Sequence, residues 1–180
     1  MRRSLLLSSL LLVACAASAQ LRPVPDGDLF LRVIANKIVV HPEDSLMLKV
    51  EVTNVGRDPI LLLPDDLCLN PEAGLNLRIT DSGGHEIKTA TPLTCVPTPS
   101  LSDQERFVRI DPDAFYGRVL RLQLSRLLPK PGVYTLEFTL HGTLTRAQAA
   151  QMLAPQKRKL VVFTSDCRTL ASTFRIEVQP

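Results

Sequence analysis

Hydrophobic and polar residues alternate along most of the chain with a period of two, which places successive side chains on opposite faces of a β-sheet. Residues 45–54 show this best, because aliphatic residues alternate with mostly polar ones until Asn54-Val55-Gly56 ends the run with turn chemistry. The same pattern predicts strands at 75–80, 117–124, 133–140 and 173–178, and weaker patterns predict strands at 29–34, 37–40, 60–63, 107–110 and 160–164. Short strands separated by Pro, Gly and Asp turns are typical of sandwiches and barrels, so we predict an all-β fold.

A hairpin turn and a helix start stand out between these strands. Asp81-Ser82-Gly83-Gly84 predicts a hairpin whose second strand covers residues 85–90. Thr145-Arg146-Ala147-Gln148 has the spacing of a capping box, and Pro155 ends the helical pattern that follows. The sequence therefore predicts one short helix, inserted near the C-terminus of an otherwise antiparallel fold.

Residues 1–19 have the three parts of an export signal. Arg2 and Arg3 form a basic start, an apolar stretch follows, and Ala17-Ser18-Ala19 fits a cleavage site. The apolar stretch is shorter than the roughly 20 residues that a membrane-spanning helix needs. We therefore expect an exported protein, periplasmic or extracellular.

The same segment also fits a second kind of processing. Leu12-Val13-Ala14-Cys15 matches the lipobox of bacterial lipoproteins, in which residues 1–14 are removed and Cys15 is diacylated. A lipid on Cys15 would then be the only attachment to a membrane. Both alternatives stay open, and in both we expect an N-terminal linker at 20–28 and one domain at 29–180.

Three cysteines remain in the expected domain, in a compartment where disulfides are chemically permitted. Cys68 and Cys95 both lie in proline-containing loops that flank the same pair of predicted strands, so we favour a bridge between them over a pairing of either with Cys167. Such a bridge would stabilise the fold by about 3 to 4 kcal/mol in the chain-entropy model.

Several short motifs resemble those of bacterial immunoglobulin-like domains. Pro131-Gly132-Val133-Tyr134-Thr135-Leu136 is similar to the start of a late strand in such domains, Val52-Thr53-Asn54-Val55-Gly56 to the end of their second core strand, and residues 81–86 to a common hairpin turn. One related group is the domain resembling the intracellular proteinase inhibitor of Bacillus. The resemblance covers residues 29–140 and implies an antiparallel immunoglobulin-like β-sandwich in which Tyr134 bonds a nearby backbone group. It departs in the helix-bearing insertion and in the cysteines.

Catalytic, metal-binding and nucleic-acid-binding patterns are missing from the sequence. The 21 Lys and Arg nearly balance the 18 Asp and Glu, which argues against a nucleic-acid partner. His41, His85 and His141 stand apart from one another, and no nucleophile motif is present. The acids at 65–66, 81, 111 and 113 are typical of turns. We therefore predict no enzyme activity, no cofactor and no metal.

What remains is a binding function. Phe115-Tyr116-Gly117 follows an Asp-Pro-Asp turn, so this aromatic pair is either a loop tip that contacts a partner or a plug that closes one end of the core. We expect a noncatalytic module that binds a protein or peptide in the cell envelope. The alternative is an inhibitor or regulator of an exported protease, acting through the proline-rich loop at 91–103.

Overall fold

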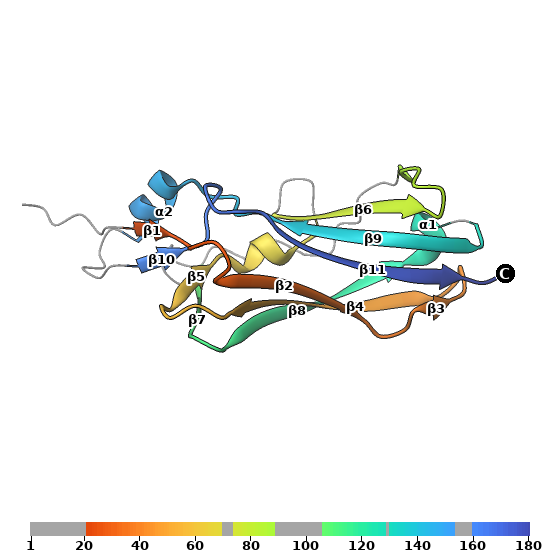
Figure 1. Ribbon diagram of the computed structural model, residues 1–180, viewed down its shortest axis with the longest axis horizontal. Helices are drawn as coiled ribbons and strands as arrows, with labels where there is room; N and C mark the ends of the chain where they lie inside the picture. Colours follow the sequence, from red (N-terminus) through yellow and green to blue (C-terminus); the bar gives the residue numbers. More distant parts are fainter. Residues whose placement is uncertain (1–20, 70–73, 89–105, 129, 154–159) are drawn as a thin grey trace, which may run out of the picture.

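The computed structural model describes residues 21–69, 74–88, 106–128, 130–153 and 160–180, and about half of them lie in β-strands (Figure 1). The elements in chain order are β1 (Leu21–Pro23), β2 (Leu29–Ala35), β3 (Val39–Val40), β4 (Ser45–Asn54), β5 (Ile60–Leu62), the 3-10 helix η1 (Pro64–Leu67), β6 (Leu75–Asp81), β7 (Val108–Ile110), β8 (Phe115–Gln123), α1 (Leu124–Leu127), β9 (Gly132–Leu140), α2 (Arg146–Met152), β10 (Leu160–Val162) and β11 (Leu170–Val178). The prediction of an all-β chain is confirmed.

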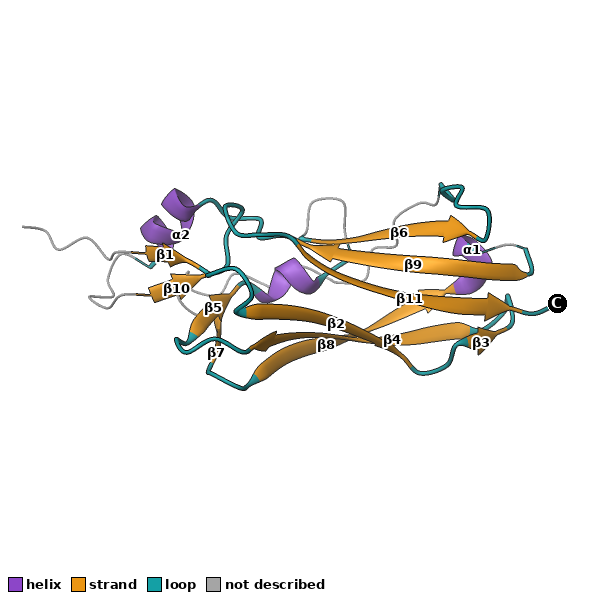
Figure 2. Ribbon diagram, viewed as in Figure 1, coloured by secondary structure: helices purple, strands orange, loops and turns teal. Residues whose placement is uncertain are grey.

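Two sheets face each other along most of the molecule (Figure 2). One has the strand order β2-β4-β8 and is antiparallel throughout, and the other has the order β3-β11-β9-β6. Both turn their apolar side chains inward into one core, which includes Leu48 and Val50 from β4 and Leu136 and Phe138 from β9. The ring of Phe138 stacks on that of Phe174 at a centroid distance of 5.9 Å. The alternation along the sequence therefore marks half-buried strands that share one core.

The chain passes from one sheet to the other between β2 and β3. β2 pairs with β4, whereas β3 runs parallel to β11, with Val39 opposite Glu177 and Val40 opposite Val178. The amide of Glu177 donates to the carbonyl of Ile38 at 2.8 Å. Residues 29–40 thus join the two sheets along one side.

A smaller sheet, β1-β10-β5-β7, lies at one end of the molecule and carries α2. Ala149, Leu153 and Val162 form a second small core there. β1 pairs in parallel with β10, so the segment expected as a linker begins with a strand. The predicted capping box of α2 is confirmed, because the Thr145 amide donates to Gln148 Oε1 at 2.8 Å and the Gln148 amide donates to Thr145 Oγ1 at 3.3 Å.

Two predicted boundaries are wrong. Leu124 was expected to end a strand but begins α1, where the side chains of Leu124, Leu127 and Leu128 are buried together with the spacing of one helical turn. The hairpin turn after β6 is present, since Asp81 Oδ1 accepts from the amides of Gly83 and His85, both at 2.9 Å. Its second strand shortens to a single bridge between Thr80 and Glu86 in the described residues, and residues 89–90 lie outside them.

Tyr134 makes the contact that the sequence predicts for it. Its side chain is buried, and its hydroxyl donates to the carbonyl oxygen of Lys130 at 2.9 Å. This bond connects the start of β9 to the loop that precedes it.

Candidate functional site

The aromatic pair at 115–116 lies at the start of β8 and not on a loop tip. Phe115 points outward and is 59% exposed, with the Lys49 ammonium 5.2 Å from its ring centroid. Tyr116 points the other way and packs against the core. Strand geometry therefore separates the two side chains: one closes the core, and the other contributes to an exposed face.

That exposed face is the outer surface of the sheet β2-β4-β8, and it carries large apolar side chains. We call the following set the apolar face: Phe30, Ile34, Met47, Phe115 and Val119. The ladder places them in rows across the strands, because Phe30 and Phe115 flank Thr53, and Ile34 and Val119 flank Lys49. The apolar side chains therefore share one surface, on which Thr53 and Lys49 lie between them.

The charged residues of this surface are mostly basic. Arg32, Lys49 and Arg121 are exposed between or beside the apolar side chains. Glu51 is nearly buried and forms an ion pair with Lys49. The apolar face is thus interleaved with positive charge that is only partly balanced.

The outer surface of the second sheet differs sharply. Three of its exposed positions are apolar, Val39, Val133 and Ala171, and the others on β9 and β11 carry polar or charged side chains: Thr135, Glu137, Thr139, Thr173, Arg175 and Glu177. This composition is that of a solvated sheet face, in which outward residues are polar. The two outer surfaces therefore differ in composition.

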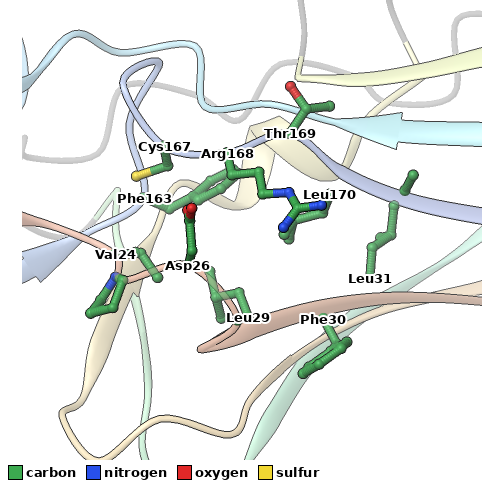
Figure 3. A pocket seen from close by; sticks show the side chains of 13 residues that line it. Val24, Asp26, Leu29, Phe30, Leu31, Phe163, Cys167, Arg168, Thr169 and Leu170 are labelled. Atoms are coloured by element: carbon green, nitrogen blue, oxygen red, sulfur yellow. The ribbon is translucent and has the colours of Figure 1, made fainter.

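A cavity of about 280 Å³ opens between the start of β2 and the segment 163–171 (Figure 3). Its lining includes the apolar residues Val24, Leu29, Leu31, Phe163 and Leu170. Asp26, Cys167 and Arg168 add two charges and a thiol. None of these residues stood out in the sequence as a site, because the strands that meet here are far apart in the chain.

Cys167 is a free thiol in the wall of this cavity. Its Sγ lies 3.4 Å from the amide of Thr164 and 3.7 Å from the carbonyl oxygen of Val162. Cys68 is buried beside β8, and its Sγ accepts from Arg118 Nη1 at 3.2 Å. Cys95 and Cys15 lie outside the described residues, so both the bridge between Cys68 and Cys95 and the lipidation of Cys15 stay predictions.

The carboxylate of Asp66 is buried, which the turn-like sequence around it did not predict. Asp66 in η1 is 1% exposed, and its Oδ1 accepts from the Thr143 hydroxyl at 2.6 Å. Burial raises the pKa of Asp66 from 3.8 to about 6, although the bonds from Thr143 oppose this. Gly74 packs so closely here that a side chain on it would contact the Asp66 Cβ.

The three histidines have local partners close to strand ends. His41 Nδ1 lies 3.1 Å from the carbonyl oxygen of Pro180, His85 lies beside Asp81, and His141 Nδ1 lies 3.3 Å from Asn76 Nδ2. Within the described ranges no group of three His, Cys, Asp or Glu residues could hold a metal ion. The loop at 91–103 lies outside those ranges.

Comparisons with known proteins give weak structural likeness only. No protein family and no curated protein matches the sequence. Solved structures with some likeness include the β-glucosidase EmGH1 of Erythrobacter marinus (14% identity, TM-score 0.37, 84% of this chain and 15% of that one) and the α-2-macroglobulin of E. coli (15%, 0.38, 85% and 7%). A third is the structural genomics target SoR45 (12%, 0.35, 87% and 86%).

The chain thus spans less than a sixth of the first two of these proteins. Among the helices that the structure describes, none has the length and apolar character to cross a membrane.

Proposed function

We propose that this chain is a noncatalytic binding module that holds a protein partner in the cell envelope through the apolar face. The observation that carries the proposal is the placement of five large apolar side chains on one outer sheet surface, opposite a polar surface on the other sheet. Large exposed apolar side chains gathered on one surface are typical of interaction sites. A lone exposed apolar residue would not support such a role.

Strand order supports an immunoglobulin-like architecture for this module. β2, β4 and β8 fit strands A, B and E of that fold, and β6, β9 and β11 fit strands C, F and G of its second sheet. The Tyr134 hydroxyl, which bonds the backbone four residues upstream, fits the tyrosine corner at the start of strand F. The small sheet and α2 are additions to this plan.

The residue types of the apolar face fit a protein partner. Phe, Met and Arg are enriched in protein interfaces, and two Phe, one Met and two Arg lie on this surface. Arg32 lies between the two apolar rows and Arg121 lies opposite Met47, so a complementary partner presents carboxylates among its apolar side chains. Two copies of this chain placed face to face would instead bring basic side chains together.

Export and the bridge between Cys68 and Cys95 belong to the same proposal. The segment at 1–19 supports export, and the buried site of Cys68 suits a disulfide that anchors the loop containing Cys95.

The test uses a partner isolated from the native host. A photoreactive residue introduced at Val119 should crosslink one envelope protein, which is identified by mass spectrometry and purified. Phe115→Ser and Val119→Ser should each weaken its binding about tenfold or more, as expected for central interface residues. Val133→Ser is the matched control, because Val133 is an exposed apolar residue on the other sheet. Equal affinity of all three variants and the wild type would refute the proposal.

A further inference from the structure

We propose that the cavity between β2 and β11 binds a free apolar α-amino acid, with Arg168 holding its carboxylate, Asp26 its ammonium group, and an apolar wall its side chain. This site shares one residue with the apolar face. Phe30 borders both, whereas Phe115 and Val119 do not line the cavity.

The cavity follows from the way two edge strands meet. β2 and β11 run side by side but form no ladder with each other in the part of the chain that the structure describes. The Val33 amide donates to Ser172 Oγ at 3.1 Å and so bridges the two strands midway along β2. Nearer their starts, at Leu29 and Leu170, the side chains line the cavity and leave room for a ligand.

The inner wall is apolar and built from buried side chains. Val24, Leu29, Leu31 and Phe163 are all buried, so the core holds them in place. A cavity of about 280 Å³ lies at the lower end of the range for ligand sites, which suits a single amino acid. Burial of one Leu-sized side chain in it contributes about 1.5 to 3 kcal/mol.

The mouth carries one positive and one negative group. Figure 3 shows the side chains of Arg168 and Asp26 among those that line the cavity. Neither side chain forms an ion pair with another described residue. Both charges are exposed, so they keep their hydration until a ligand arrives.

This pair of charges decides the ligand class. A simple carboxylate would bond Arg168 but would be repelled by Asp26. A simple amine would bond Asp26 but would be repelled by Arg168. A wholly apolar ligand would cover both charges without bonding either. A zwitterion with an apolar side chain satisfies all three parts of the cavity.

The experiment uses the exported chain, residues 20–180, and three matched probes. L-leucine carries both charges, 4-methylpentanoate lacks the ammonium group, and 3-methylbutylamine lacks the carboxylate. NMR titration of the backbone amides should give a Kd of about 1 mM for leucine, with about tenfold weaker binding of each analogue. The amides that shift should be those of residues 24–31 and 163–171.

Two variants test the assignment of each charge. Arg168→Gln should abolish the preference for leucine over 3-methylbutylamine. Asp26→Asn should abolish the preference for leucine over 4-methylpentanoate. Phe115→Ser is the control and should leave leucine binding unchanged. Saturating leucine should also slow alkylation of Cys167 by iodoacetamide, because this thiol lies in the wall. Leucine that binds no better than both analogues, or shifts amides elsewhere, overturns the proposal. Either result leaves the proposed protein interface untouched.

Discussion

Raising the pH from about 4 to about 7 should destabilise this fold through one buried carboxyl group, Asp66. Its pKa rises from 3.8 to about 6 because burial removes the hydration of the charged form. The folded protein therefore holds this proton more tightly than the unfolded chain does. The resulting stability is complete below about pH 4 and is lost as the pH rises through about 6.

The size of the effect follows from the interval between the two pKa values. Each pH unit of that interval is worth about 1.4 kcal/mol, so the free energy of unfolding should fall by about 3 kcal/mol through Asp66 alone. Asp44 and Asp81 have the opposite effect on stability, at lower pH. The backbone amide of His41 donates a hydrogen bond to Asp44 and that of His85 to Asp81, and these bonds hold the pKa of each carboxyl below its usual value.

The assay is urea unfolding at a series of pH values for the wild type and Asp66→Asn. The variant cannot ionise at this position, so its free energy of unfolding relative to the wild type should rise with pH between about 4 and about 7. Asp113→Asn is the control, because Asp113 is exposed and its φ of 59° suits Asn. Parallel curves for Asp66→Asn and the wild type would refute the reasoning.

Three further predictions concern other contacts in the structure. Tyr134→Phe removes the hydroxyl that bonds the preceding loop, so urea unfolding should show a free energy of unfolding about 1 kcal/mol lower than that of the wild type. An unchanged value would mean that this hydrogen bond does not stabilise the fold. Asn54→Ala removes three hydrogen bonds of a fully buried amide, so the free energy of unfolding should fall by about 3 kcal/mol in the same assay. A smaller loss than that of Tyr134→Phe would contradict this prediction. Titration of oxidised residues 20–180 with a thiol reagent under denaturing conditions should find one thiol, Cys167, because the proposed bridge joins Cys68 to Cys95. Three reactive thiols would refute the bridge.

The strands of the two long sheets could be predicted because each has one buried and one outward face. β4 has the predicted bounds, and β6, β8, β9 and β11 differ from theirs by a few residues. β1 could not be predicted, since it is three residues long, includes a proline and depends on a partner at 160–162. α1 was missed because the alternation of leucines along β8 continues into Leu124 before the helical spacing begins.

The sites were harder to predict than the strands because they depend on contacts between residues that are far apart in the chain. Asp66 has the sequence context of a turn, and only its contact with Thr143, 77 residues later, shows that it is buried. The apolar face could not be predicted without the register of three strands, which places Phe30 and Phe115 in one row on either side of Thr53. Arg168 and Asp26 line one cavity only because the starts of β2 and β11 come together.

The position of β11 governs when the molecule can assemble. This strand is the closest to the C-terminus, yet it lies inside its sheet between β3 and β9, and it contacts β2 from 139 residues away. During synthesis β2, β4 and β8 can pair early, but β3 has no ladder partner and β9 lacks one of its neighbours until Leu170–Val178 has emerged. Closure of the core is therefore a late step that joins distant parts of the chain, and such steps are slow. For the export proposed above, this delay would keep the chain unfolded while it crosses the membrane.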